Sequence, residues 1–208
     1  MATEEPKFTL ALKDGAFELR DYPALIVAEV TVTGTQQEAS RAGFRKLAGY
    51  IFGGNAGAKR IAMTTPVTKA RIGATSGQKI AMTAPVTQTG DKGDWAVRFT
   101  MPAGLALADL PQPNDPGVTL KTLPAMRCAV VRFSGLSGEA AVAGQTAKLL
   151  ALVAARRLAP TGPVTQARYN PPWTPWFMRR NEVMVPVGTP VVAAPEMAVG
   201  STRQDARH

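Results

Sequence analysis

Histidine and cysteine are almost absent from this chain of 208 residues. His208 is the only histidine and Cys128 the only cysteine. A single cysteine excludes a disulfide within the chain and any multi-cysteine metal site. Without a second histidine, the usual Ser–His, Cys–His and zinc arrangements are not expected. The phosphate-binding patterns GxxxxGK[ST] and GxGxxG are also missing, so we expect a protein that is not an enzyme.

Long apolar runs are missing as well. The chain has no eighteen consecutive apolar residues, so we expect no membrane-spanning helix and no integral membrane contact. The first residues lack the apolar stretch of a secretory signal, and the lone cysteine suits a reducing compartment, which together favour the cytoplasm. The net charge is +9, but basic residues never run more than two in succession. With no basic tail and no recognisable nucleic-acid motif, we expect no nucleic-acid partner.

What the chain does contain is an internal match at an offset of 101 residues. Segment 19–34, LRDYPALIVAEVTVTG, aligns without a gap on segment 120–135, LKTLPAMRCAVVRFSG. Each segment predicts two strands around a Pro-Ala corner, with a helix after the closing glycine. Identical residues occupy these aligned pairs: Leu19/Leu120, Pro23/Pro124, Ala24/Ala125, Ala28/Ala129, Val30/Val131 and Gly34/Gly135.

A helical pattern follows each of the matched segments 19–34 and 120–135. The first helix is expected to begin at Thr35, whose spacing from Glu38 is that of a capping box. An apolar stripe follows, and Gly53 and Gly54 are expected to end this helix. The second helix is expected from about Ser137, with Pro160 limiting its extent.

A second repeat lies between these units. Residues 61–68, IAMTTPVT, return at 80–87 as IAMTAPVT. Apolar side chains alternate in both copies, which predicts two strands with one apolar face each, and we expect them to be antiparallel neighbours. Pro66 and Pro85 cannot donate to a ladder, so each predicts an edge position or a bulge. Further strands are expected at 95–102, 164–170 and 181–187.

These elements predict one α+β domain over residues 1–189. It consists of duplicated strand–strand–helix–strand–strand units at about 17–102 and 118–187. Because each unit has a sheet face that needs cover, two sheets are expected to pack into a distorted antiparallel β-barrel or sandwich with two helices outside. Residues 190–208 show no periodicity and predict a disordered C-terminal tail.

Three stretches of the chain resemble the SOUL haem-binding protein family. They are DGAFELRDYP, KIAMTAPV and YNPPWTPWFMRRNEV, and the likeness extends from about residue 7 to 187. The resemblance implies a duplicated α+β barrel, related to the effector-binding domains of some bacterial regulators. It also implies reversible binding of haem or another tetrapyrrole, with buffering, transfer or sensing of haem as the expected role.

The same resemblance suggests where haem contacts would fall. One group is Lys46, Arg60 and Met63, at the end of the first helix and in the strand after it. The other is the proline-rich loop 171–179, with Trp173, Trp176, Phe177, Met178 and Arg179. The chain departs from family members that use a histidine as the iron ligand, because His208 lies in the expected tail.

The residues themselves leave alternatives open. Tyr169, Trp173, Trp176 and Phe177 either line a slot for a flat ligand or plug the end of the barrel as core. Arg179 and Arg180 follow; they either bind carboxylates, pair with Glu182 or stay solvated. No axial iron ligand can be assigned among Tyr169, Met63, Met82, Met178 and Cys128. Binding of haem by hydrophobic contact, with a weak axial bond or none, is favoured. Cys128 lies in an apolar strand and is expected to be a small buried hydrophobe.

A second function also fits the pattern. Glu182 shares strand parity with Met184, so we expect it to face inward. An inward carboxylate in an apolar pocket would suit a cationic organic ligand. The alternative is therefore a non-enzymatic regulatory or protein-interaction module that binds another hydrophobic or cationic small molecule or a peptide.

Overall fold

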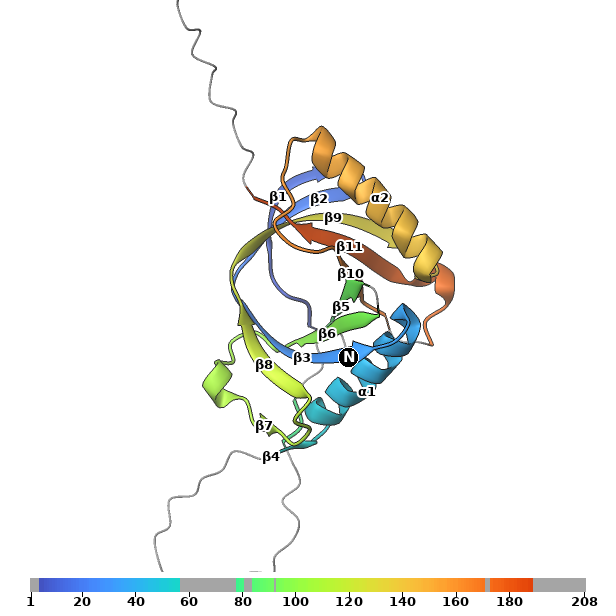
Figure 1. Cartoon of the computed structure of the whole chain (residues 1–208). Coiled ribbons are helices and arrows are strands. Elements are labelled where there is room, and N and C mark those ends of the chain that lie inside the picture. The colour runs from blue at the N-terminus through green and yellow to red at the C-terminus, as the bar shows by residue number, and fades with distance from the viewer. Residues whose placement is uncertain (1–3, 57–77, 81–83, 92, 171–172, 189–208) are drawn as a thin grey trace, which may run out of the picture.

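A computed structural model describes residues 4–56, 78–80, 84–91, 93–170 and 173–188. Within these ranges the chain forms a curled antiparallel sheet of nine strands and two α-helices (Figure 1). Neither helix is long and apolar enough to cross a membrane. The α+β architecture with two helices outside a curled antiparallel sheet is confirmed. The predicted domain extent, 1–189, stays a prediction.

The sheet has the strand order β1-β2-β9-β11-β10-β5-β6-β3-β8. Two short strands, β4 (Asn55–Ala56) and β7 (Gln112–Pro113), pair separately. The nine strands have these bounds: β1 Thr9–Asp14, β2 Phe17–Tyr22, β3 Leu25–Thr33, β5 Val86–Asp91, β6 Asp94–Thr100, β8 Val118–Leu123, β9 Met126–Ser134, β10 Thr165–Arg168 and β11 Arg180–Pro186.

Strand pairing is symmetric about the middle of the sheet. Leu19 of β2 lies opposite Ala129 of β9, and Leu120 of β8 lies opposite Ala28 of β3. Leu19 corresponds to Leu120 and Ala28 to Ala129 at the 101-residue offset, so the two strand pairs are equivalent. At the centre, Gln88 of β5 faces Gln166 of β10. This reciprocal register supports the proposal of a duplicated unit.

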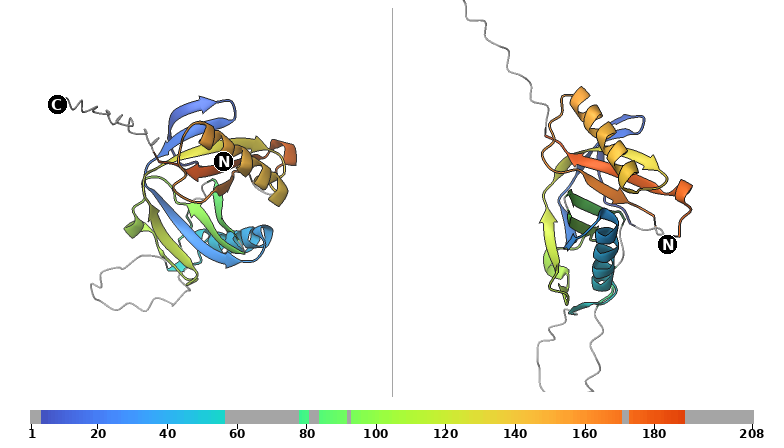
Figure 2. Two further views of the ribbon diagram at one scale, coloured as in Figure 1. Left: turned by 45° about the horizontal axis from the view of Figure 1, so that its top comes forward. Right: turned by 45° about the vertical axis from the view of Figure 1, so that its right-hand side comes forward.

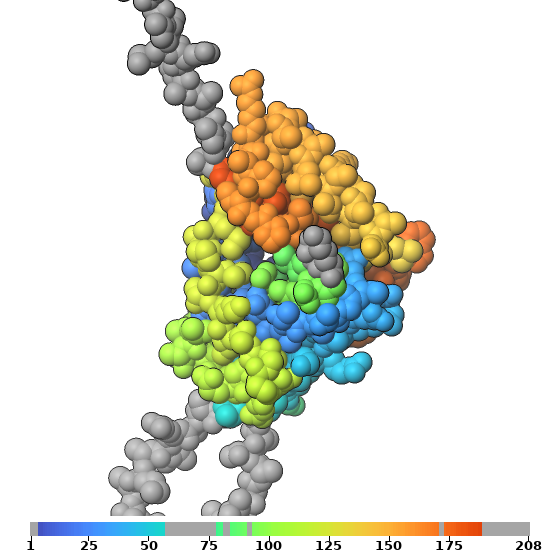
Figure 3. All heavy atoms as spheres, viewed as in Figure 1, coloured from blue at the N-terminus to red at the C-terminus, as the bar shows by residue number. Residues whose placement is uncertain are grey.

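Each half of the sheet carries one helix on its outer side (Figures 1 and 2). Helix α1 (Gln36–Ile51) packs on β3 and β6, and α2 (Glu139–Ala155) packs on β9 and β11. The capping box predicted for Thr35 and Glu38 is present. In the space-filling view, α2 lies on the upper right-hand side of the molecule and α1 on the lower right-hand side (Figure 3).

Side chains alternate between the helix-covered face and the concave face of the sheet. In β3, Ala28 and Val30 belong to the core under α1, whereas Val27 points to the concave side. In β9, Ala129 and Val131 pack under α2, whereas Cys128 points to the concave side. The two helices therefore leave the concave face available for a binding site.

The second copy of the repeated IAMT phrase follows the prediction only in part. The strand expected over 80–87 is wrong at Ile80, Ala84 and Pro85, because β5 begins only at Val86, and 81–83 lie outside the described residues. Pro85 has no amide hydrogen, so it cannot donate to the ladder that β5 forms from Val86. Ile80 is buried, and its amide donates to the Ile51 carbonyl at 2.8 Å, outside any strand. The first copy, 61–68, lies outside the described residues, as does the predicted tail.

The expectation of two separate sheets is also wrong. β5 and β10 pair with each other, so the two units join edge to edge in one curled sheet. An edge strand with unpaired amides gains backbone hydrogen bonds when it pairs with another edge. The extra strand β1, which pairs only with β2, was not predicted.

Candidate functional site

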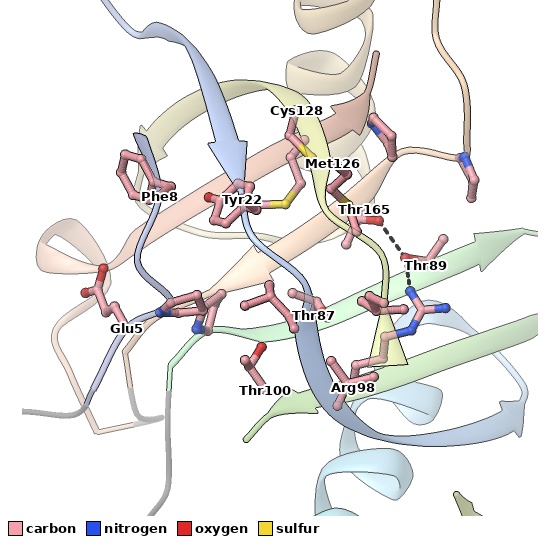
Figure 4. A pocket seen from close by; sticks show the side chains of 18 of the residues that line it. Glu5, Phe8, Tyr22, Thr87, Thr89, Arg98, Thr100, Met126, Cys128 and Thr165 are labelled. Carbon is pink, nitrogen blue, oxygen red and sulfur yellow. Dashed lines mark hydrogen bonds between the residues drawn. The ribbon is translucent and has the colours of Figure 1, made fainter. Parts of the chain in front are cut away.

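A cavity of about 210 Å³ lies on the concave face of the sheet (Figure 4). Its lining is mostly apolar and comes from every strand of the sheet except β1, together with residues before β1. The apolar contributors include Val27, Leu123, Met126, Cys128 and Met184. Because these residues occupy every second strand position, the pleat of one continuous sheet brings them together.

One end of the cavity is polar. The hydroxyls of Thr89 and Thr165, from β5 and β10, lie 2.7 Å apart, and Arg98 Nη1 is 3.4 Å from Thr89 Oγ1 (Figure 4). Arg98 also donates to Glu29 at 2.5 Å, and Lys121 Nζ donates to the other oxygen of Glu29 at 2.5 Å. Burial alone would raise the pKa of Glu29, but these two cations hold it below its usual value.

The other side of the concave face holds a buried ion pair. Arg20 Nη1 and Nη2 donate to the two oxygens of Glu182 at 2.8 and 3.0 Å, and the side chains are only 1% and 0% exposed. Arg180 donates to Glu182 Oε1 at 3.0 Å and the Tyr169 hydroxyl donates to Oε2 at 2.6 Å. Burial opposes ionisation of Glu182, yet these donors lower its pKa. The inward direction predicted for Glu182 is confirmed.

Residues 4–8, here named the N-terminal strap, lie across this face. The Glu4 carbonyl accepts a hydrogen bond from the Ala84 amide at 2.8 Å, and Glu5 pairs with Arg180 at 3.0 Å. The Phe8 ring lies 5.4 Å from that of Tyr22, centroid to centroid, and the Arg20 guanidinium lies 4.4 Å from the Phe8 centroid. Glu5 and Phe8 both line the cavity, so the strap forms part of its wall.

Cys128 is buried, with 2% of its surface exposed, as predicted. Burial raises the pKa of its thiol to about 11, so at neutral pH this group is a neutral thiol rather than a thiolate. Nearby, burial together with the adjacent Glu182 carboxylate raises the pKa of the Tyr169 hydroxyl. The cavity therefore offers neither a thiolate nor a phenolate at neutral pH.

The buried thiol leads to a prediction for alkaline solution. An unfolded cysteine ionises near pH 9, whereas the folded thiol resists ionisation up to about pH 11. The stability that the neutral thiol contributes is complete below pH 9 and is lost as the pH rises to 11. Relative to Cys128→Ala, the wild type should lose about 2–3 kcal/mol of unfolding free energy across this range. Urea unfolding of both proteins at pH 8 to 11 measures the difference, and parallel pH profiles would contradict the prediction.

The aromatic residues predicted as a slot or a core plug divide into two groups. Tyr169 is partly buried and lines the cavity. Trp173, Trp176, Phe177 and Met178 are exposed, Trp173 by 82%, so the core alternative is wrong for the rings of Trp173, Trp176 and Phe177. Three of the four exposed residues form the 3-10 turn η2 (Trp176–Met178), where the rings of Trp176 and Phe177 meet edge to face at 5.8 Å. The four exposed residues are named the aromatic loop.

The basic residues predicted to contact haem do not lie together either. Arg180 pairs with Glu182, as one alternative had it, and its guanidinium lies 3.8 Å from the centroid of the Tyr169 ring. Arg179 is partly buried, and its Nε donates to the Thr174 carbonyl at 2.8 Å. Lys46 lies on α1, outside the concave cavity, and its Nζ is 3.5 Å from Asp115. Arg60 and Met63 lie outside the described residues.

Three charged residues of the concave face were missed by sequence reasoning. Arg20, Glu29 and Arg98 share strand parity with Tyr22, Val27 and Thr100, which line the cavity, and that parity was the available signal. The threonine pair gave no signal, because Thr89 and Thr165 are 76 residues apart.

Solved structures with this fold have low sequence identity to the chain. The C-terminal domain of EcmrR matches with a TM-score of 0.54 and 14% identity, over 87% of this chain and 98% of that one. EcmrR in a complex with DNA matches with a TM-score of 0.58 and 13% identity, over 82% and 56%. A hydrolase from Listeria innocua matches with a TM-score of 0.52 and 12% identity, over 86% and 94%. At such identities the likeness shows the fold alone.

No curated protein matches the chain. The model of the SOUL haem-binding protein family, however, matches residues 3–76 and 72–186. These two overlapping segments include the strands of the curled sheet, both helices and the aromatic loop. The chain belongs to the SOUL haem-binding protein family.

Proposed function

We propose that this protein binds haem or another tetrapyrrole reversibly at the aromatic loop, as a non-enzymatic cytoplasmic carrier or buffer. The observation that carries the proposal is the exposure of Trp173, Trp176, Phe177 and Met178 together. Large apolar side chains grouped on a surface are a common mark of a binding site. Flat indole and phenyl rings are suited to contact with the face of a macrocycle.

The concave cavity does not fit a tetrapyrrole. Its volume of about 210 Å³ lies below the range of roughly 300–1,000 Å³ for pockets that bury drug-sized ligands. A macrocycle with two propionates needs a pocket within that range or larger. The protonated Cys128 thiol and the Tyr169 hydroxyl bound to Glu182 also offer no anionic iron ligand. Size and chemistry therefore favour the open aromatic loop over the cavity.

Polar groups beside the loop would complete such a site. Arg179, whose Nε donates to the Thr174 carbonyl beside the aromatic rings, is proposed to meet a propionate at the edge of the loop. Met178 offers a thioether, 64% exposed, for weak axial contact. Bound haem would supply an iron centre for electron transfer or for binding a diatomic gas. An open site without an imidazole ligand suits reversible loading, as buffering or transfer requires.

The test is a hemin titration of the full chain, followed by tryptophan fluorescence and the Soret band. Hemin should quench the emission of Trp173 and Trp176 strongly. The double variant Trp173→Ala/Trp176→Ala should bind hemin at least about tenfold more weakly, because two stacking faces are lost. Its melting temperature should change little, since both side chains are exposed.

A matched control removes apolar surface elsewhere. Phe52 and Leu105 are also exposed, and the variant Phe52→Ala/Leu105→Ala should keep hemin affinity. Equal losses in both double variants would point to nonspecific adsorption of hemin. Unchanged affinity after removal of both tryptophans would overturn the placement at the aromatic loop.

A further inference from the structure

We propose that the concave cavity is a second binding site, and that it takes a small, neutral, largely apolar molecule with one hydroxyl or carbonyl group. This ligand class differs from a tetrapyrrole in size and from an organic cation in charge. The site lies on the face of the sheet opposite the helices. It does not include the aromatic loop.

The size of the cavity sets the first limit. An apolar protein cavity of about 150 Å³ is enough to hold benzene. A volume of about 210 Å³ therefore admits a molecule somewhat larger than one aromatic ring. The walls are valine, leucine, methionine and proline side chains, which attract such a molecule through burial of its surface.

The charges around the cavity set the second limit. Three buried carboxylates belong to the concave face, and each already has two cationic partners. The pairs are Glu182 with Arg20 and Arg180, Glu18 with Arg20 and Lys13, and Glu29 with Arg98 and Lys121. No net negative charge is left among these groups to stabilise a cation that loses its water shell. A neutral ligand avoids that cost.

The threonine pair supplies the polar contact. Thr89 and Thr165 share one hydrogen bond, and one hydroxyl donates in it while the other accepts. One hydroxyl hydrogen of the pair is thus available to a carbonyl or hydroxyl oxygen of the ligand. Both threonines line the cavity beside Arg98, so the polar end has a defined position (Figure 4).

The experiment compares three probes of matched size: 2-naphthol, 2-naphthoate and N-methylquinolinium. We expect 2-naphthol to bind at least about tenfold more tightly than either the anion or the cation, because burying an uncompensated charge is costly. Occupancy should also slow the reaction of Cys128 with methyl methanethiosulfonate, since this thiol is the only one in the chain and lines the cavity. Tighter binding of the cation, or no protection of Cys128 at saturation, would overturn the proposal.

Two variants locate the probe. Thr165→Val keeps the side-chain shape and should weaken 2-naphthol about three- to tenfold while leaving naphthalene unchanged, because only the hydrogen bond is lost. Equal weakening of both probes, with unchanged melting temperature, would argue against the polar contact. Trp173→Ala/Trp176→Ala should leave 2-naphthol affinity unchanged. Thr165→Val therefore tests the cavity, and Trp173→Ala/Trp176→Ala tests the aromatic loop. One proposal can fail while the other holds.

Discussion

Replacing Glu182 with alanine is expected to lower the free energy of unfolding by about 3–5 kcal/mol. The substitution removes one of the two carboxylates that hold the Arg20 guanidinium, which is 1% exposed, and leaves Glu18 as the other. It also removes one acceptor of Arg180, which keeps Glu5, and the acceptor of the Tyr169 hydroxyl. Removing one partner of a buried ion pair is costly, because the remaining charge loses compensation where water cannot replace it. Urea unfolding at pH 7 measures the loss.

A combined substitution removes the whole buried network of charges around Arg20. Arg20→Met/Glu182→Leu fills the space with apolar side chains, and Glu18→Gln is added because Glu18 also pairs with Arg20. The triple variant should recover most of the stability lost by Glu182→Ala. The exposed pair of Lys46 and Asp115 serves as a control, and removal of its charges should cost less than about 1 kcal/mol. If Glu182→Ala were no more costly than this control, the buried network would contribute little to the fold.

Short-range signals made much of the fold predictable. The Pro-Ala corners at 23–24 and 124–125 separate β2 from β3 and β8 from β9, as expected. The capping box of Thr35 depends only on residues within one helical turn. Such features are encoded by neighbours in the chain, so pattern and spacing are enough to find them.

The candidate site depends on long-range register instead. Arg20 and Glu182 are 162 residues apart, and β9 lies between their strands. Parity predicted that Glu182 faces inward, but its partners follow from the order of strands in the sheet. The aromatic loop shows the same limit: spacing allowed either buried or exposed rings, and tertiary packing decides which.

The charged groups of the concave face also reveal how the two units differ. Arg20 and Lys121 occupy equivalent positions at the 101-residue offset. Arg20 pairs with Glu182 of β11, whereas Lys121 pairs with Glu29 of β3. Equivalent cations thus meet carboxylates from strands that are not equivalent. The cavity between them is asymmetric, which gives it one polar end and one mainly apolar wall.

A second large effect is expected where α1 packs on β6. Gly43 is buried there, and a Cβ atom at this position would lie 2.6 Å from Val97 Cγ2 and 2.7 Å from Val97 Cβ. Gly43→Leu should therefore destabilise the fold by about 3 kcal/mol or more, because a tightly packed contact must open. The loss should exceed the gain of roughly 1 kcal/mol from better helix propensity.

The same helix contains its own control. Gly49 is exposed and a Cβ there meets nothing within 4 Å, so Gly49→Leu should keep or slightly raise stability. Val97→Ala should relieve part of the clash in the Gly43→Leu background, which thermal unfolding of the single and double variants can measure. Because Arg98 and Thr100 line the cavity from the other face of β6, the clash should also weaken 2-naphthol binding. Equal stability of Gly43→Leu and Gly49→Leu would mean that α1 does not depend on this close contact.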